Sequence, residues 1–219
     1  MTGAATHLHS TIATYQQAFR EHGRSEAALL WTKNKQAERF AALCKAIPDT
    51  STTVLDYGCG LGDLAVWLST HRPRAVYLGA DAVPEFIANN REALPGLTFT
   101  HVEHPDFLQE SYDHVVCSGV FNLNPTKTPE AHWQYVQDVL LALFRRTRKS
   151  LHVDFLAHDV DYKHPQGYHQ DLSTLLSFVE RQLSRRYELD RSYMPYEYCV
   201  SIFKNVEIER SRNVYASPP

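Results

Sequence analysis

The spacing of apolar residues changes between two periods along this chain, and the two periods separate helices from strands. Apolar residues that recur every three or four positions predict helices. Short apolar runs bounded by glycine, proline or an acid predict buried strands. The pattern predicts helices over residues 11–19, 25–47, 84–94, 129–148 and 171–186, and strands over 75–80, 97–102, 112–118 and 150–156, after a first strand that ends at residue 55.

The order of these elements predicts the fold. Five strands alternate with helices, which is the pattern of a parallel sheet covered on both faces. Residues 187–193 and 197–204 are extended runs separated by too few residues for a crossover helix, so this pair must be antiparallel. We predict a doubly wound, mostly parallel α/β sheet of seven strands with one antiparallel edge strand. Residues 1–50 are expected to form an N-terminal helical cap of the same domain, residues 51–206 the ligand-binding part, and residues 207–219 a C-terminal tail.

A strand, a glycine turn and a helix follow one another in residues 53–68. Glycines at positions 58, 60 and 62 let a ligand approach the main chain closely, and the helix start offers N–H groups. This arrangement is typical of a nucleotide pocket. The dinucleotide fingerprint needs a glycine at position 63, but Asp63 stands there and would repel a diphosphate, so NAD is disfavoured. An ordinary glycine-rich turn is the alternative.

A ligand with an amino acid end and no phosphate fits this turn better, with its carboxylate on the loop N–H groups and its ammonium near Asp56. S-adenosylmethionine has that shape, and over about residues 52–204 the chain resembles the class I S-adenosylmethionine-dependent methyltransferases. The family's first motif is a hydrophobic pair, an acid and a G-x-G loop, matched here by Val54, Leu55, Asp56, Gly58 and Gly60, with Cys59 inside the loop. The resemblance implies S-adenosylmethionine as the cofactor of this site.

Two further acids follow strands two and three. Asp81 ends the second strand at about the distance from the turn at which an acid accepts hydrogen bonds from ribose hydroxyls. A cap on the helix that begins at Pro84 is its alternative role, and Ala82 would lie near the adenine. The resemblance implies that Asp106 accepts from the adenine amino group and that Phe107 lies on the adenine face. A plain loop acid is the alternative for Asp106.

The run at residues 118–122 follows the fourth strand, at the edge where strand ends line the crevice of such a sheet. It resembles the S-G-[IV]-F-N run of bacterial small-molecule methyltransferases. The DNA amino-methyltransferases carry [DN]-P-P-[YFW] there, which disfavours a base-flipping enzyme. We expect the methionine part of the cofactor to contact Ser118 and Gly119, and the methyl acceptor to contact Phe121, Asn122 and Tyr193.

Methyl transfer is an in-line displacement at a sulfonium methyl, so the enzyme mainly orients the reactants. A base is needed only when the acceptor must lose a proton. His152 and Asp154, which strand alternation puts on one side of the fifth strand, are candidates. Tyr196 and Glu197 of the final hairpin are two more, and a structural role is the alternative for each of the four. Arg39, in the cap, could reach into the site, but a solvated helical face is the expected role.

Composition narrows the partners. The 219 residues are 43% hydrophobic and 21% charged, as in ordinary globular proteins. A net charge of -3 gives no broad attraction to nucleic acid or an anionic membrane. The four cysteines show no C-x-x-C pairing, and the histidine-rich segment 158–169 fits no recognised ligand motif, so no metal is expected. With no apolar signal-peptide core and no membrane-length run, the chain is expected to be cytoplasmic.

We therefore predict a methyltransferase that uses S-adenosylmethionine to methylate a small-molecule acceptor, with specialised metabolism as a candidate context. Two alternatives stay open. The chain would otherwise be a non-catalytic binding or accessory protein that keeps the pocket, or a methyltransferase that modifies protein or nucleic acid. The sequence specifies neither the acceptor atom nor the oligomeric state, because this fold hosts many chemistries.

Overall fold

The computed structural model of the protein describes residues 3–30, 35–124 and 128–204. Its centre is an eight-stranded sheet with the order β3-β2-β1-β4-β5-β8-β7, and β6 pairs with β5 outside this path. The strands are β1 (Thr53–Tyr57), β2 (Val76–Asp81), β3 (Thr98–His101), β4 (Tyr112–Cys117), β5 (Thr147–Ala157), β6 (His169–Gln170), β7 (Tyr187–Asp190) and β8 (Glu197–Phe203).

The pairing directions confirm the predicted fold class. Strand β1 is parallel to β2 and β4, β2 to β3, and β4 to β5. Strand β8 is antiparallel to both β5 and β7, so the reversed member of the hairpin lies next to the edge strand β7. The strand order reverses between β1 and β4, and such a switch point is where ligands bind in open α/β sheets.

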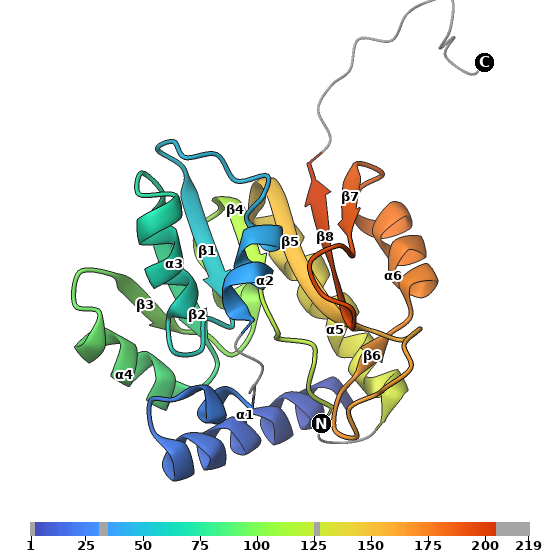
Figure 1. Cartoon of the computed structure of the whole chain (residues 1–219), viewed down its shortest axis with the longest axis horizontal. Helices are drawn as coiled ribbons and strands as arrows, with labels where there is room; N and C mark the ends of the chain where they lie inside the picture. The colour runs from blue at the N-terminus through green and yellow to red at the C-terminus, as the bar shows by residue number, and fades with distance from the viewer. Residues whose placement is uncertain (1–2, 31–34, 125–127, 205–219) are drawn as a thin grey trace, which may run out of the picture.

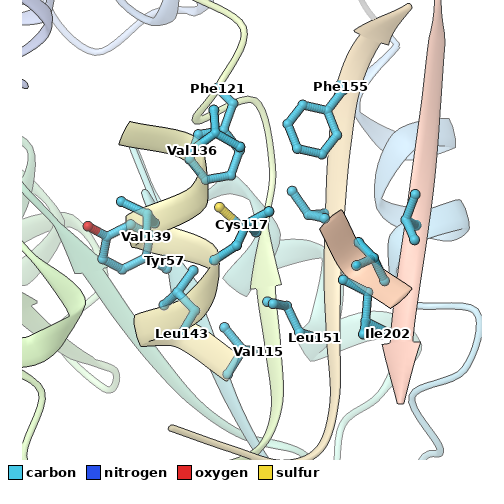
Figure 2. Close-up of a cluster of buried hydrophobic side chains, with 14 of the residues drawn as sticks. Tyr57, Val115, Cys117, Phe121, Val136, Val139, Leu143, Leu151, Phe155 and Ile202 are labelled. Carbon is cyan, nitrogen blue, oxygen red and sulfur yellow. The ribbon is translucent and has the colours of Figure 1, made fainter. Parts of the chain in front are cut away.

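Helices cover both faces of the sheet (Figure 1). They are α1 (Gly3–His22), α2 (Gln36–Leu43), α3 (Asp63–His71), α4 (Pro84–Ala93), α5 (Pro129–Arg146) and α6 (Leu172–Phe178), with short turns η1 (Glu26–Leu29), η2 (Pro105–Phe107) and the π-helical η3 (Val179–Leu183). The core on one face joins α2, α3 and α4 to the sheet. The core on the other face joins α5 and α6 to it, and Figure 2 shows Val136, Val139 and Leu143 of α5 beside Val115 of β4 and Leu151 of β5.

The N-terminal cap differs from its prediction. One helix was expected over residues 25–47, but the chain forms the short turn η1 and then α2, with residues 31–34 outside the described part. Leu30 ends η1 with a φ of 56°, in the left-handed region where a helix cannot continue. Helix α1 ends at His22, and Gly23 follows it with a φ of 59°. Helix α1 then lies along the end of the sheet toward which β1 points (Figure 1).

Two expectations concern the rest of the chain. Within the described ranges, none of the helices combines the length and apolarity that a bilayer crossing requires. The expected C-terminal tail, residues 207–219, lies outside the described residues. The division into a cap and a ligand-binding part remains a proposal.

Candidate functional site

A cavity of about 500 Å³ lies at the carboxyl edge of the sheet. Its volume falls within the roughly 300–1,000 Å³ of small-molecule sites. Its walls come from α1, η1 and α2 on the cap side and from the glycine turn after β1, the end of β2, the loop after β4 and residues 164–167 on the other. The cavity therefore lies between the segments that the sequence singled out and the N-terminal helices.

The glycine turn after β1 lines this cavity, and its shape depends on the lack of side chains. Gly58 has a φ of 77°, and a Cβ there would lie 2.2 Å from Cγ2 of Val120. Gly60 has a φ of 51°, and a Cβ there would lie 2.8 Å from Cδ2 of Leu29, which reaches over the turn from η1. The positive φ favours glycine at both positions, and the close approach of Val120 adds a packing requirement at Gly58.

The N–H groups of the turn are bonded within the protein. Gly58 and Cys59 donate to the carbonyl oxygen of Ala80 at 2.7 and 3.1 Å. Gly60 donates to Oδ2 of Asp81 at 2.8 Å. The prediction that the loop presents these N–H groups to a ligand carboxylate is therefore wrong for these three residues, because the end of β2 already accepts them.

Main-chain hydrogen bonds fix the carboxylate of Asp81 at the end of β2. It lines the cavity, and its Oδ1 accepts from the N–H of Val83 at 2.8 Å while Oδ2 holds Gly60. Each carboxylate oxygen has more than one acceptor site, so both oxygens keep capacity for a ligand hydroxyl. Burial raises the pKa of Asp81, and its backbone hydrogen bonds oppose that rise.

Asp56 lies inside β1 and also lines the cavity, so it does not follow the strand as expected. Burial raises its pKa to about 7, although the hydroxyl of Tyr77 donates to Oδ2 at 2.8 Å and opposes the rise. With Asp63 and Asp81, it gives the end of the cavity at the glycine turn three carboxyl groups. Such a site is electrostatically suited to a cation.

Tyr15 of α1 is a cavity residue that the sequence analysis missed. Burial raises its pKa to about 12, and the charge of Asp81 adds to the rise. Its ring packs edge-on against Phe86 of α4, as Phe19 does, with centroid distances of 6.1 and 5.4 Å. The sequence does contain a feature that could have identified Tyr15: Ile12, Tyr15 and Phe19 have helical spacing, which places them on one buried face of the helix.

A solvated helical face was favoured for Arg39 over a position in the site, but the structure supports the second alternative, because Arg39 is buried and lines the cavity. Its Nε lies 3.1 Å from Oδ2 of Asp154, and its Nη2 donates to Oε1 of Glu197 at 2.8 Å. We call these three residues the Arg39 cluster. Asp154 also accepts from the N–H of Gly119 at 2.6 Å and the hydroxyl of Ser118 at 3.1 Å. The cluster thus ties α2 to β5, β8 and the loop after β4.

The four candidate catalytic residues do not line the cavity. Asp154 and Glu197 lie behind it in the Arg39 cluster, and Tyr196 is also absent from its walls. His152 is fully buried, and its ring bonds the hydroxyls of Ser150 and Ser201 at 2.7 and 2.8 Å. Burial lowers the pKa of His152 to about 3, so the ring is neutral. Its placement supports the structural alternative and contradicts the catalytic prediction.

The predicted adenine contacts are also displaced. Phe107 is 66% exposed, and Asp106 accepts from Nη2 of Arg145 at 2.8 Å on the surface. Neither Phe107 nor Asp106 lines the cavity, whereas Ala82 does. The short turn η2 places both residues at the surface, which supports the alternative role of Asp106 as a plain loop acid.

The run after β4 divides between the cavity and the core. Ser118, Gly119 and Asn122 line the cavity as expected of binding residues. Phe121 instead stacks on Phe155 in the core at a centroid distance of 5.4 Å (Figure 2), which contradicts its predicted contact with the acceptor.

Tyr193 is likewise absent from the cavity walls. Its buried hydroxyl has no hydrogen-bond partner among the residues that the structure describes. Burial raises the pKa of this hydroxyl, and the charges of Asp154 and Glu197 raise it further. The residues after β5 that do reach the cavity, His164, Gln166 and Gly167, were missed because a polar loop gives no periodic signal.

Comparison with known proteins agrees with this geometry. Residues 55–149 match the family model described as a methyltransferase domain. A Mycobacterium tuberculosis protein named as a methyltransferase, Rv1506c, is 26% identical over 160 residues, which cover 69% of this chain and 93% of that protein.

Solved structures show the same fold. Magnesium protoporphyrin IX methyltransferase from Synechocystis PCC 6803, with bound S-adenosylmethionine, superposes with a TM-score of 0.63 at 15% identity, over 94% of this chain and 98% of that one. The pyocyanin biosynthetic protein PhzM superposes with a TM-score of 0.60 at 11% identity, over 87% of this chain and 62% of that one. A TehB-like methyltransferase from Corynebacterium glutamicum gives 0.54 at 17% identity, over 90% and 99%.

Proposed function

We propose that this chain, a class I S-adenosylmethionine-dependent methyltransferase, transfers the methyl group of its cofactor to a small molecule bound in the same cavity. The observation that carries the proposal is the cavity itself. It places the glycine turn, Asp81 and the run after β4 on one wall, and α1 encloses them from the other side. A concave cavity of about 500 Å³ suits small reactants better than a macromolecular surface.

The residues present fit the cofactor. S-adenosylmethionine carries a sulfonium and an ammonium against one carboxylate, so its net charge is positive. The carboxyl groups of Asp56, Asp63 and Asp81 at the turn complement that charge. We assign Asp81 to the ribose hydroxyls, Ala82 to the adenine side, and Ser118 and Gly119 to the methionine part. The bound cofactor supplies an electrophilic methyl group, and the protein orients the acceptor toward it.

The cavity favours a reaction that depends on orientation more than on a base. None of the four candidate bases lines it, and the Arg39 cluster holds two of them in ion pairs. An acceptor atom that carries a lone pair and has no proton to lose needs only alignment with the methyl group. The same observation also favours a second candidate, a protein that binds S-adenosylmethionine without transferring its methyl group.

Calorimetric titration with S-adenosylmethionine tests cofactor binding. Asp81→Asn should weaken binding about tenfold or more, because an amide loses acceptor capacity toward the ribose and the turn. Asp138→Asn on α5 removes the same charge outside the cavity walls and should leave the affinity unchanged. Binding that is undetectable at millimolar cofactor in the wild type would refute the proposal. Transfer of labelled methyl across a panel of small acceptors then separates the enzyme from the binding protein.

A further inference from the structure

Arg24 joins the N-terminal helices to the glycine turn. It lies between α1 and η1, and this end of α1 lies near α4 (Figure 1). Its Nη2 donates to the carbonyl oxygen of Leu61 at 2.7 Å, and its Nη1 donates to Oδ1 of Asn90 on α4 at 3.0 Å. Nη1 also donates to Oδ1 of Asn89 at 2.7 Å. One guanidinium therefore bonds both the end of the turn and the helix beside it.

Asn90 connects this contact to Gly60. Its side chain is fully buried, and its Nδ2 donates to the carbonyl oxygen of Gly60 at 2.7 Å. A guanidinium only donates and a carbonyl oxygen only accepts, so Oδ1 must face Arg24 and Nδ2 must face Gly60. The reversed amide would lose both hydrogen bonds. The orientation of the Asn90 amide is therefore fixed, and this amide links Arg24 to the turn.

Gly60 is held from two sides. Its carbonyl oxygen accepts from Asn90, and its N–H donates to Oδ2 of Asp81 at 2.8 Å. Leu29 of η1 also lies against it, since a Cβ at position 60 would be 2.8 Å from Cδ2 of Leu29. Gly60 and Asp81 line the cavity. Arg24 and Asn90 do not, so they act on a ligand through the turn.

We propose that Arg24 and Asn90 are positioning residues for the cofactor: they hold Gly60 in the orientation in which its N–H fixes the carboxylate of Asp81. The inference rests on the proposed function, which assigns Asp81 to the ribose hydroxyls. Glycine has little torsional restraint of its own, so the orientation of Gly60 depends on such hydrogen bonds. The N-terminal helices thus contribute to cofactor affinity through Arg24, which does not touch the cofactor.

The variant Asn90→Asp tests the link to Gly60 in the full chain. The change is isosteric, keeps an oxygen for Arg24 and replaces the donor to Gly60 by an acceptor. The neighbouring guanidinium keeps the new carboxyl group ionised. We expect the affinity for S-adenosylhomocysteine in calorimetry to fall about tenfold or more, because a hydrogen bond is replaced by repulsion between two oxygens. This ligand carries no net charge, which limits any direct effect of the added charge.

Asn89→Asp is the matched control. It adds the same charge one residue away on the same helix and still accepts from Arg24. Among the described residues, Asn89 forms no hydrogen bond with the turn. The affinity of Asn89→Asp should therefore equal that of the wild type.

Substitutions of Arg24 test the other end of the link. Arg24→Met should weaken binding about three- to tenfold, because the hydrogen bonds to Leu61 and Asn90 are lost. Arg24→Lys should recover part of that loss, since a single ammonium lacks the planar fork that reaches both partners. Arg20→Met should leave the affinity unchanged, because Arg20 bonds Gln17 within α1. Arg24 is exposed, so these variants give an answer even if Asn90→Asp fails to fold.

A signal from Gly60 itself separates positioning from general stability. The sequence contains one Cys–Gly pair, Cys59–Gly60. Labelling the carbonyl carbon of cysteine and the amide nitrogen of glycine therefore gives a single NMR cross-peak, from the N–H that bonds Asp81. In the ligand-free protein this proton should move upfield in Asn90→Asp, as its hydrogen bond weakens, and stay in place in Asn89→Asp. A loss of global stability alone would not move the signal of the folded protein. Arg24→Met should move it in the same direction by less.

The outcomes are distinct. Wild-type affinity in folded Asn90→Asp and Arg24→Met, or a Gly60 signal that neither variant moves, overturns the inference and leaves the proposed function intact. An equal loss of affinity in Asn89→Asp also overturns it, because the effect would then come from charge. If the wild type binds neither S-adenosylmethionine nor S-adenosylhomocysteine, the proposed function fails, and the Gly60 signal decides whether Arg24 and Asn90 position the turn.

Discussion

The glycine turn after β1 gives a sharp test of how this site is built, through the change of Gly58 to Ala. Two costs are expected. A non-glycine residue in the left-handed region costs about 1–2 kcal/mol, and Gly58 has a φ of 77°. The new Cβ would also lie 2.2 Å from Cγ2 of Val120, so one of them must move. Overpacking of this kind costs about 1–3 kcal/mol.

Gly23 provides a matched control for the first cost. Its φ is 59°, but a Cβ added there meets nothing within 4 Å. Gly23→Ala should therefore report the torsional cost alone, reduced by the stiffer unfolded chain, to about 1 kcal/mol or less. We expect Gly58→Ala to lower the free energy of unfolding by about 2–4 kcal/mol. Urea denaturation followed by tryptophan fluorescence measures both.

The double variant Gly58→Ala/Val120→Ala isolates the second cost. Removing the Val120 methyl groups opens the space that the new Cβ needs, so the coupling free energy should be about 1–3 kcal/mol in the stabilising direction. If Gly58→Ala costs no more than Gly23→Ala, or if Val120→Ala gives no rescue, close packing between position 58 and Val120 does not shape the turn. Cofactor affinity measured on the same variants then shows whether the contact between position 58 and Val120 affects binding as well as stability.

Three further predictions concern charged and titratable groups. Arg39→Met should lower the free energy of unfolding by about 3–5 kcal/mol, because two carboxyl groups stay buried without their partner; exposed Arg145→Met should cost about 1 kcal/mol or less in the same urea experiment. With the pKa of Asp56 at about 7, affinity for the cationic cofactor should fall as the pH drops through 7, since the carboxyl group must first lose a proton. The fall should approach tenfold per pH unit in calorimetry, and an equal slope in Asp56→Asn would contradict this. Burial lowers the pKa of His152 to about 3, so its Cε1 proton shift should stay constant from pH 8 to 5 in NMR spectra; a titration near pH 6.5 would show that the ring is not sealed in the core.

The sequence by itself determined the order of strands and helices, the antiparallel hairpin at the end and the position of the glycine turn. These features are encoded locally: apolar spacing distinguishes helix from strand, and glycine is needed where φ is positive. The sequence also predicted that Asp81 and residues 118–122 lie at the ligand-binding edge of the sheet, because the carboxyl ends of parallel strands meet there. The confirmed predictions concern features that are set by residues close in sequence or by the general rules of how strands are connected.

Only the tertiary structure decided which side chains reach the cavity. Arg39 is polar and lies on a short helix, so nothing local shows that Asp154 and Glu197, far along the chain, bury it. His152 and Phe121 occupy positions that strand and loop patterns cannot assign to core or crevice, because the neighbouring layer makes that choice. Contacts between distant segments set burial, and burial sets both the pKa of a group and its access to a ligand.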